Sequence, residues 1–202
     1  MIKKLLGGLF RKEKIEEPNF IVATLNDKIM PIDRGEIYED PLNELLIAEN
    51  IGKVTGGGTM QEASGEIDYC DVEIKLNSTE IDKTIINNII EKLESFGAPK
   101  GSFLTIEKTQ EKINVGKLEG IGIYLDGINL PKNVYEECDI NFVITEFHRL
   151  TETEYIVNRN WQNETGIALY FYGESFEKMK TQIKDLVENY PLCENCRIEQ
   201  IA

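Results

Sequence analysis

The chain has 202 residues, of which 41% are hydrophobic and 29% charged, and its formal net charge is -14 at pH 7. This composition is typical of a folded globular protein and excludes wholesale disorder. Nucleic acid and anionic membranes would repel so acidic a chain, so we expect no nucleic-acid partner and expect a basic protein partner instead.

Residues 1–19 form a basic amphipathic segment and a linker. Apolar residues would share one side of a helix, with basic residues beside them: Ile2, Leu5, Leu6, Leu9 and Phe10, then Lys3, Lys4, Arg11 and Lys12. One reading is a weak contact with a membrane surface, or a docking segment, through these basic residues. The other is a helix on the protein's own surface, or a frayed end. The apolar part is too short for a membrane span or a secretory signal, so we expect a cytoplasmic protein.

Two segments 100 residues apart resemble each other, which indicates a duplication. Phe20–Pro31 and Gly120–Pro131 each read as a strand, then a turn, then a proline. The turns are Asn26-Asp27 in the first copy and Asp126-Gly127 in the second. We therefore expect a first repeat at 20–107, a connector at 108–119 and a second repeat at 120–202.

Each repeat predicts the same order of elements. The first gives a strand at 20–25, a helix from Asp40-Pro41 to Gly52, strands at 53–60 and 66–76, a helix capped by Ser78 or Thr79 and ended by Gly97, and a strand at 101–107. The second gives strands at 121–125, 155–160, 166–173 and 197–201, and helices at 134–150 and 175–190. This order predicts an α+β fold, a tandem duplication of a ferredoxin-like β-α-β-β-α-β unit whose antiparallel sheets carry helices on one face.

The two predicted sheets differ on their other face. In 71–76 the apolar Val72, Ile74 and Leu76 alternate with Asp71, Glu73 and Lys75, which is typical of a strand with one solvated face. In 167–172 both faces are apolar or aromatic, so both should be buried. The cover would be the first repeat, the N-terminal segment or another subunit, and the last of these would make a homodimer.

Candidate partner-binding residues gather on the strand at 66–76 and in the second repeat: Glu66, Asp68, Tyr69, Asp71, Glu73 and Trp161. Carboxylates on a strand could recognise a basic partner, form an ordinary solvated face, or support acid–base or metal chemistry. Trp161 is either an exposed anchor for a partner or a filler between the two repeats.

Glycines and cysteines allow further readings. Gly56-Gly57-Gly58 lies between strands without a following helix, which favours a bulge, close packing or a flexible binding edge over a phosphate loop. Cys193-Glu-Asn-Cys196 is a single C-x-x-C that follows a helix and precedes a strand, so we expect a structural role, with redox and metal roles as alternatives. His148, the only histidine, is expected at the surface or as a cap. We expect no cofactor.

Four short stretches resemble landmarks of a poorly characterised family of acidic bacterial proteins: Gly56–Thr59, Tyr69–Glu73, Gly97–Gly101 and Pro191–Cys193. Proteins of similar size and charge serve as immunity proteins, so the resemblance implies an inhibitor of a basic toxin such as a nuclease. The resemblance does not assign a functional role to any residue of this chain. We expect a non-catalytic binding protein. The alternatives are a small-ligand sensor or regulator, and an enzyme that uses the acidic strand with a divalent metal.

Overall fold

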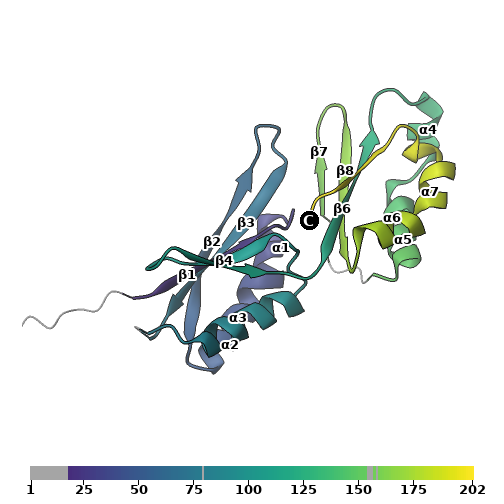
Figure 1. The fold of residues 1–202 in the computed structure, drawn as a ribbon. Coiled ribbons are helices and arrows are strands. Elements are labelled where there is room, and N and C mark those ends of the chain that lie inside the picture. Colours follow the sequence, from purple (N-terminus) through teal and green to yellow (C-terminus); the bar gives the residue numbers. More distant parts are fainter. Residues whose placement is uncertain (1–17, 79, 154–156, 158) are drawn as a thin grey trace, which may run out of the picture.

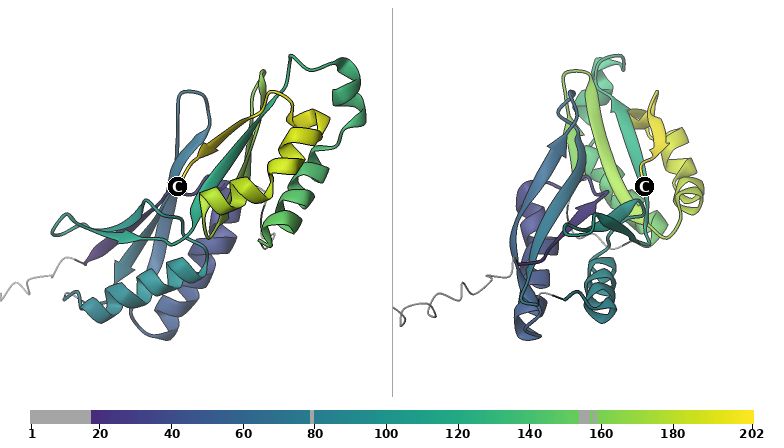
Figure 2. Two further views of the ribbon diagram at one scale, coloured as in Figure 1. Left: turned by 45° about the vertical axis from the view of Figure 1, so that its right-hand side comes forward. Right: turned by 60° about the vertical axis from the view of Figure 1, so that its left-hand side comes forward.

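The computed structural model describes residues 18–78, 80–153, 157 and 159–202, so the predictions for residues 1–17 lie outside the described residues. Each half of the chain forms one antiparallel sheet with helices packed on one face (Figures 1 and 2). Among the described residues, no helix has the length and apolarity that crossing a membrane requires.

The strands of the two sheets have the same spatial order. The first sheet is ordered β2-β3-β1-β4-β5 and contains β1 (Phe20–Leu25), β2 (Gly52–Gln61), β3 (Ile67–Leu76), β4 (Ser102–Ile106) and β5 (Glu111–Val115). The second is ordered β7-β8-β6-β9 and contains β6 (Glu119–Asp126), β7 (Arg159–Gln162), β8 (Gly166–Gly173) and β9 (Arg197–Gln200). Apart from β5, the two orders match strand for strand, which confirms a tandem duplication of a ferredoxin-like unit.

The helices also follow the predicted order, but several boundaries differ. The first unit has α1 (Pro31–Arg34), η1 (Gly35–Glu39), α2 (Asp40–Ala48) and α3 (Lys83–Ser95). The second has α4 (Lys132–Glu137), α5 (Ile140–Thr151), α6 (Phe176–Gln182), α7 (Lys184–Asn189) and the short 3₁₀ helix η2 (Pro191–Cys193).

The first helix starts nine residues before the predicted cap at Asp40. It begins at Pro31 and runs into α2 through η1, a turn of π-helix. Pro41 has no N–H, and its ring needs room beside the preceding turn, which the wider π-helical turn provides. The capping prediction for the next helix was also wrong, because Asp82 and not Ser78 accepts the hydrogen bond from the backbone N–H of Thr84.

The second unit breaks both of its predicted helices. The helix at 134–150 is interrupted at Cys138, and Asp139 starts α5 by accepting a hydrogen bond from the N–H of Asn141. The helix at 175–190 is interrupted at Ile183. The connector predicted at 108–119 contains β5, which pairs with β4 and extends the first sheet by one strand.

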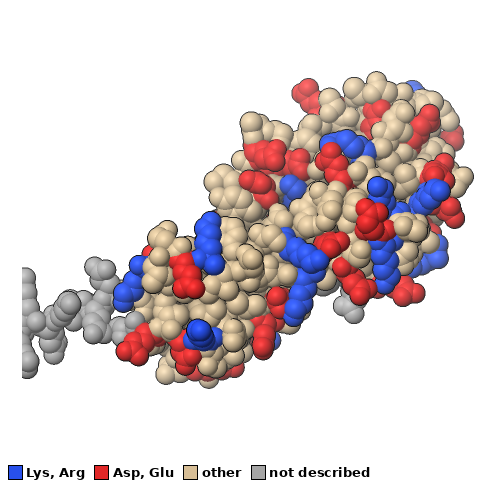
Figure 3. Space-filling model, viewed as in Figure 1, with Lys and Arg blue, Asp and Glu red and all other residues tan. Residues whose placement is uncertain are grey.

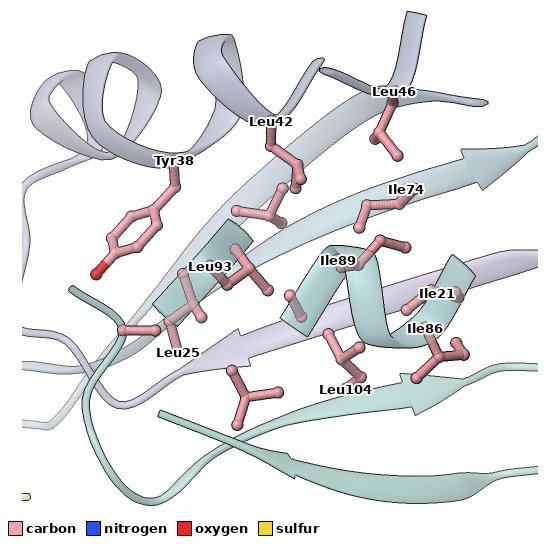
Figure 4. Close-up of a cluster of buried hydrophobic side chains, with 14 of the residues drawn as sticks. Ile21, Leu25, Tyr38, Leu42, Leu46, Ile74, Ile86, Ile89, Leu93 and Leu104 are labelled. Carbon is pink, nitrogen blue, oxygen red and sulfur yellow. The ribbon is translucent and has the colours of Figure 1, made fainter. Parts of the chain in front are cut away.

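Each unit has its own apolar core between sheet and helices. In the first, the side chains of Leu42, Leu46 and Leu93 extend from the helices onto Ile21 and Ile74 of the sheet (Figure 4). In the second, the rings of Phe147 and Phe171 stack with centroids 3.7 Å apart. Every second residue of each central strand points into such a core. The residues between them point to the opposite face of the sheet, away from the helices.

Candidate functional site

The face of the second sheet that carries no helices is covered by the first unit. This was one of the three covers predicted from the sequence. Tyr170 and Tyr172 of β8 are directed at the first unit, while Leu169 and Phe171, which alternate with them, enter the core of the second. The N–H of Lys28 donates a 3.0 Å hydrogen bond to the hydroxyl oxygen of Tyr172. Both faces of β8 are therefore buried, and this prediction was correct.

A buried ion pair fixes the two units to each other. Arg159 Nε and Nη2 donate to the two carboxylate oxygens of Asp27, at 2.7 and 2.9 Å. The hydroxyl group of Tyr38 donates a third hydrogen bond to Asp27 at 2.8 Å. Burial alone would lower the pKa of Arg159, but the charge and hydrogen bonds of Asp27 outweigh it and raise the pKa. A two-point contact of this kind sets both distance and orientation.

Glu66, one of the predicted partner-binding residues, belongs to this same interface. Its Oε1 accepts hydrogen bonds from Tyr170 at 2.7 Å and Tyr124 at 3.0 Å, and it pairs with Lys28 Nζ at 3.2 Å. Its side chain is only 13% exposed. Burial would raise the pKa of Glu66, yet the hydrogen bonds and the ammonium group hold it below the ordinary value. Glu66 therefore holds the two units together and is not available on the surface for a partner.

The junction leaves little room for a ligand. The hollow that the described residues enclose there measures about 60 Å³ and is lined partly by His148 and Arg159. That space suits about two water molecules. His148 was expected at the surface or as a cap, but it is half-buried against the junction, where burial lowers its pKa and its Nδ1 lies 2.9 Å from Thr153 Oγ1.

The corresponding face of the first sheet carries no helix in the described part of the chain, and on it Lys112 Nζ of β5 lies 4.0 Å from the ring centroid of Phe103. Its side chains are half-buried and come from β1, β3 and β4: Phe20, Val22, Thr24, Tyr69, Asp71, Glu73, Lys75, Phe103 and Thr105. We call this set the open face. Val72, Ile74 and Leu76 point the other way and are buried, as predicted.

Two of the predicted carboxylates lie side by side on the open face. Asp71 accepts a 2.7 Å hydrogen bond from Thr24 Oγ1, and Glu73 accepts one of 2.5 Å from Thr55 Oγ1. Within the described part of the chain, neither carboxylate has a basic group within ion-pairing distance. Hydroxyl groups orient these side chains but leave their charges unneutralised.

Charge differs between the two ends of the β2–β3 side of the open face. Toward the β2–β3 turn, Asp71 and Glu73 follow Tyr69, which lies opposite the 48% exposed Met60. At the other end Lys75 lies opposite Lys53. Like charges directly opposite each other are unfavourable in a sheet, so folding alone does not explain this lysine pair. In Figure 3, acidic side chains gather over the tip of the β2–β3 hairpin.

The remaining predicted site residues lie at or near this hairpin. Asp68 is exposed at an irregularity of the strand, where Tyr69 pairs with Met60 but Ile67 pairs with Gln61. Trp161 is half-buried on β7, two residues from Arg159, and a methyl group at Gly65 would lie 3.8 Å from its indole nitrogen. It therefore lies against the hairpin turn, as expected for a filler between the units.

The three glycines of β2 are not equivalent. A side chain on Gly57 would lie 2.4 Å from the carbonyl oxygen of Asp71 and 2.9 Å from Glu39, whereas Gly56 and Gly58 have open space. A register shift between Val54 and Gly56 marks a bulge. The segment thus combines the predicted bulge and close packing, and Gly56 and Gly58 leave a bare strip of backbone beside the two carboxylates.

The cysteines are free thiols in the structure: Cys70, Cys138, Cys193 and Cys196. In the described part of the chain, no three side chains of the His, Cys, Asp and Glu types are grouped so that they could hold a metal ion. Burial raises the pKa values of Cys193 and Cys196, so both are protonated at neutral pH.

Sequence reasoning missed the residues that join the two units. Asp27 was read only as part of a turn, because a single residue gives no sign of a partner 132 positions away. The sequence signal for the junction was the Tyr170-x-Tyr172 pattern, on a strand whose two faces are both apolar or aromatic and should both be buried. It predicted that a cover exists but not which residues provide it.

Comparisons with known proteins add little to this description. A scan against protein-family models matched none, and a search of curated proteins gave no match. An unknown protein from Galdieria sulphuraria is 11% identical, with a TM-score of 0.26, covering 91% of this chain and 96% of that one. The first two RRM domains of yeast poly(U)-binding protein Pub1 are 10% identical, with a TM-score of 0.25, covering 90% and 99%. These scores are too low to support an argument, so the fold assignment rests on strand order and pairing.

Proposed function

We propose that this chain is a non-catalytic binding protein that docks a basic protein on the open face, at the end with Asp71 and Glu73. The observation that carries the proposal is the contrast between the two sheets. One helix-free face is covered by the other unit, while the equivalent face of the first sheet bears two carboxylates that have no ion-pair partner among the described residues. The net charge of -14 adds long-range attraction for a basic partner.

The proposed contact has an apolar part as well as a charged part. Met60 and Tyr69 lie across from each other beside Asp71, and Gly58 allows a partner to approach the backbone. Interfaces commonly place aromatic and Met side chains at their centre and charges around them. An inhibitor of a basic toxin such as a nuclease is the specific form of the proposal, supported by the acidity and by the resemblance to immunity-type proteins.

The test compares two baits of equal net charge in pull-downs from the native cell. One carries Asp71→Asn and Glu73→Gln, and the matched control carries Glu136→Gln and Glu188→Gln on exposed helix positions of the second unit. A protein that the wild type and the control retain, that the first bait loses, and that salt releases would support the proposal. Equal retention by both double variants would contradict docking at this face.

A second candidate function follows from a cleft of the second unit. It measures about 410 Å³ and is lined by apolar residues such as Ile140, Ile167 and Leu192, with Asp126 and Glu164 among the polar ones. This volume is in the range of small-molecule sites, whereas the hollow between the units is too small. It favours the small-ligand alternative at this cleft. A metabolite that raises the melting temperature of the wild type but not of Ile140→Trp would support that alternative.

A further inference from the structure

The C-x-x-C sequence spans a tight turn at the start of β9. The N–H of Cys196 donates a 3.1 Å hydrogen bond to the carbonyl oxygen of Cys193. Between them, Glu194 has φ -59° and ψ 136°, and Asn195 has a φ of 62°. These angles are those of a type II β-turn, which needs a residue such as Asn or Gly with positive φ at its third position.

This turn brings the two cysteines into the range of a disulfide. The ends of a β-turn have Cα atoms less than about 7 Å apart, and disulfides span Cα distances of about 4.4–6.8 Å. The two side chains share the same surroundings, because Cys193 lies in the core of the second unit and Cys196 packs against that core. Cys196 is the more exposed of the two, so a small oxidant can reach it.

A third thiol lies nearby and must be considered as a competing partner. Cys138 ends α4, which contacts η2, and its charge when ionised contributes to the raised pKa of Cys193. Cys70 is different, since it is buried on β3 in the core of the first unit. The chain therefore provides an internal control thiol as well as an alternative partner.

We propose that Cys193 and Cys196 form a disulfide-modification site that low-molecular-weight disulfides close. The Cys196 thiolate attacks glutathione disulfide, which forms a mixed disulfide and releases one glutathione thiolate. The Cys193 thiolate then attacks Cys196 Sγ and releases the second glutathione. Two protein thiols become one disulfide, one glutathione disulfide becomes two glutathione molecules, and the two protons pass to solvent or to the leaving thiolates.

The thiols are protonated at neutral pH, which makes this site different from a catalytic C-x-x-C. Catalytic sites stabilise a thiolate, usually at a helix N-terminus, and thereby favour the reduced form. Here burial raises the pKa of Cys193 to about 12, and no helix starts at the pair. Closure is therefore slow at neutral pH, faster at higher pH, and the disulfide is stable once formed.

Closure would act on the strand that follows. Arg197 begins β9 and lies with its guanidinium carbon 4.0 Å from the ring centroid of Tyr124, which in turn donates to Glu66 at the junction. The carbonyl oxygen of Ile201 accepts a 3.2 Å hydrogen bond from Asn26 of the first unit. A closed turn restrains the start of a strand whose contacts reach the other unit.

The experiment counts thiols and maps them in the full chain after incubation with glutathione disulfide at pH 8. The wild type should lose two of its four thiols, and trypsin should release Asp185–Arg197 two hydrogen atoms lighter, because both cysteines lie in that peptide. Cys138→Ser and Cys70→Ser should each lose two of three thiols. Four remaining thiols in the wild type, or a link from Asp185–Arg197 to the peptide that contains Cys138, would overturn the proposal.

A second pair of variants tests whether the turn itself positions the cysteines. Asn195→Gly keeps a residue suited to positive φ, whereas Asn195→Val strongly disfavours it. Closure should be several-fold slower in Asn195→Val than in Asn195→Gly at the same pH. Equal rates would show that the folded turn does not promote the reaction and would refute the structural part of the inference.

Discussion

Arg159 and Asp27 are 132 positions apart in sequence, yet they form a two-point ion pair in which the Asp27 side chain is completely buried and that of Arg159 is 12% exposed. Tyr38 completes the set of donors to Asp27. In the described part of the chain every buried polar side-chain atom has a partner, so this junction carries no unsatisfied group. The two units are therefore held in one relative orientation.

Arg159→Met should destabilise the protein by about 3–5 kcal/mol, because it leaves the buried Asp27 carboxylate without its compensating charge. Urea unfolding followed by circular dichroism measures the change. The control is Arg149→Ala, which removes an exposed, solvent-screened pair with Glu146 and should change the stability much less. A loss for Arg159→Met no larger than that of the control would show that the buried pair does not hold the units.

Tyr38→Phe should cost about 1–3 kcal/mol, since the buried hydroxyl group donates to an ionised carboxylate. Tyr38 and Arg159 both serve Asp27, so the double variant should lose less than the sum of the single losses by at least about 0.5 kcal/mol. The measurement is a double-mutant cycle by urea unfolding. Strict additivity would mean that the two residues act independently of Asp27.

The pKa of Glu66 makes a prediction about acid stability. Its folded-state pKa is lowered from 4.5, so Glu66 stabilises the fold above its unfolded pKa, and this contribution is lost as pH falls through the folded value. Wild-type stability should therefore fall from about pH 5 toward about pH 3, and Glu66→Gln should show a shallower decline over this range. Unfolding free energies measured across these pH values test the difference in slope.

Glu146→Gln serves as the matched control for that series. Glu146 also has a lowered pKa, due first to its hydrogen bond from Arg149, but this pair lies at the surface. Solvent screens such pairs, so the control should follow the wild type closely. Identical slopes for Glu66→Gln and the wild type would contradict a role for Glu66 charge in joining the units.

The fold was predictable because its signals are local and occur twice. Alternation in 71–76 and the helix end at Gly97 each depend on neighbouring residues. The missed strand β5 has only five residues, with Ile113 and Val115 as its apolar positions, and it gains stability from pairing with β4. Two apolar positions in so short a segment are too few to reveal a strand by alternation.

The candidate site was predictable only in part, and for a related reason. The strand pattern places Asp71 and Glu73 on one face whatever surrounds them, and the structure has them there. Glu66 lies just before the strand, where the face it occupies depends on tertiary contacts with Tyr124 and Tyr170. Alternation therefore assigned residues within the strand correctly but could not separate Glu66 from them.

Gly57→Ala should destabilise the protein by about 1–3 kcal/mol, because the added methyl group would meet the Asp71 carbonyl oxygen at 2.4 Å and crowd the Arg34–Glu39 pair. The neighbouring Gly58→Ala is the matched control. Its methyl group enters open space and its φ lies outside the left-handed region, so the change should stay within about 1 kcal/mol of the wild type. Urea unfolding of both variants gives the comparison. Similar losses for the two would mean that the strand moves to accept the methyl group, and that close packing of Arg34 against β2 does not require a glycine there.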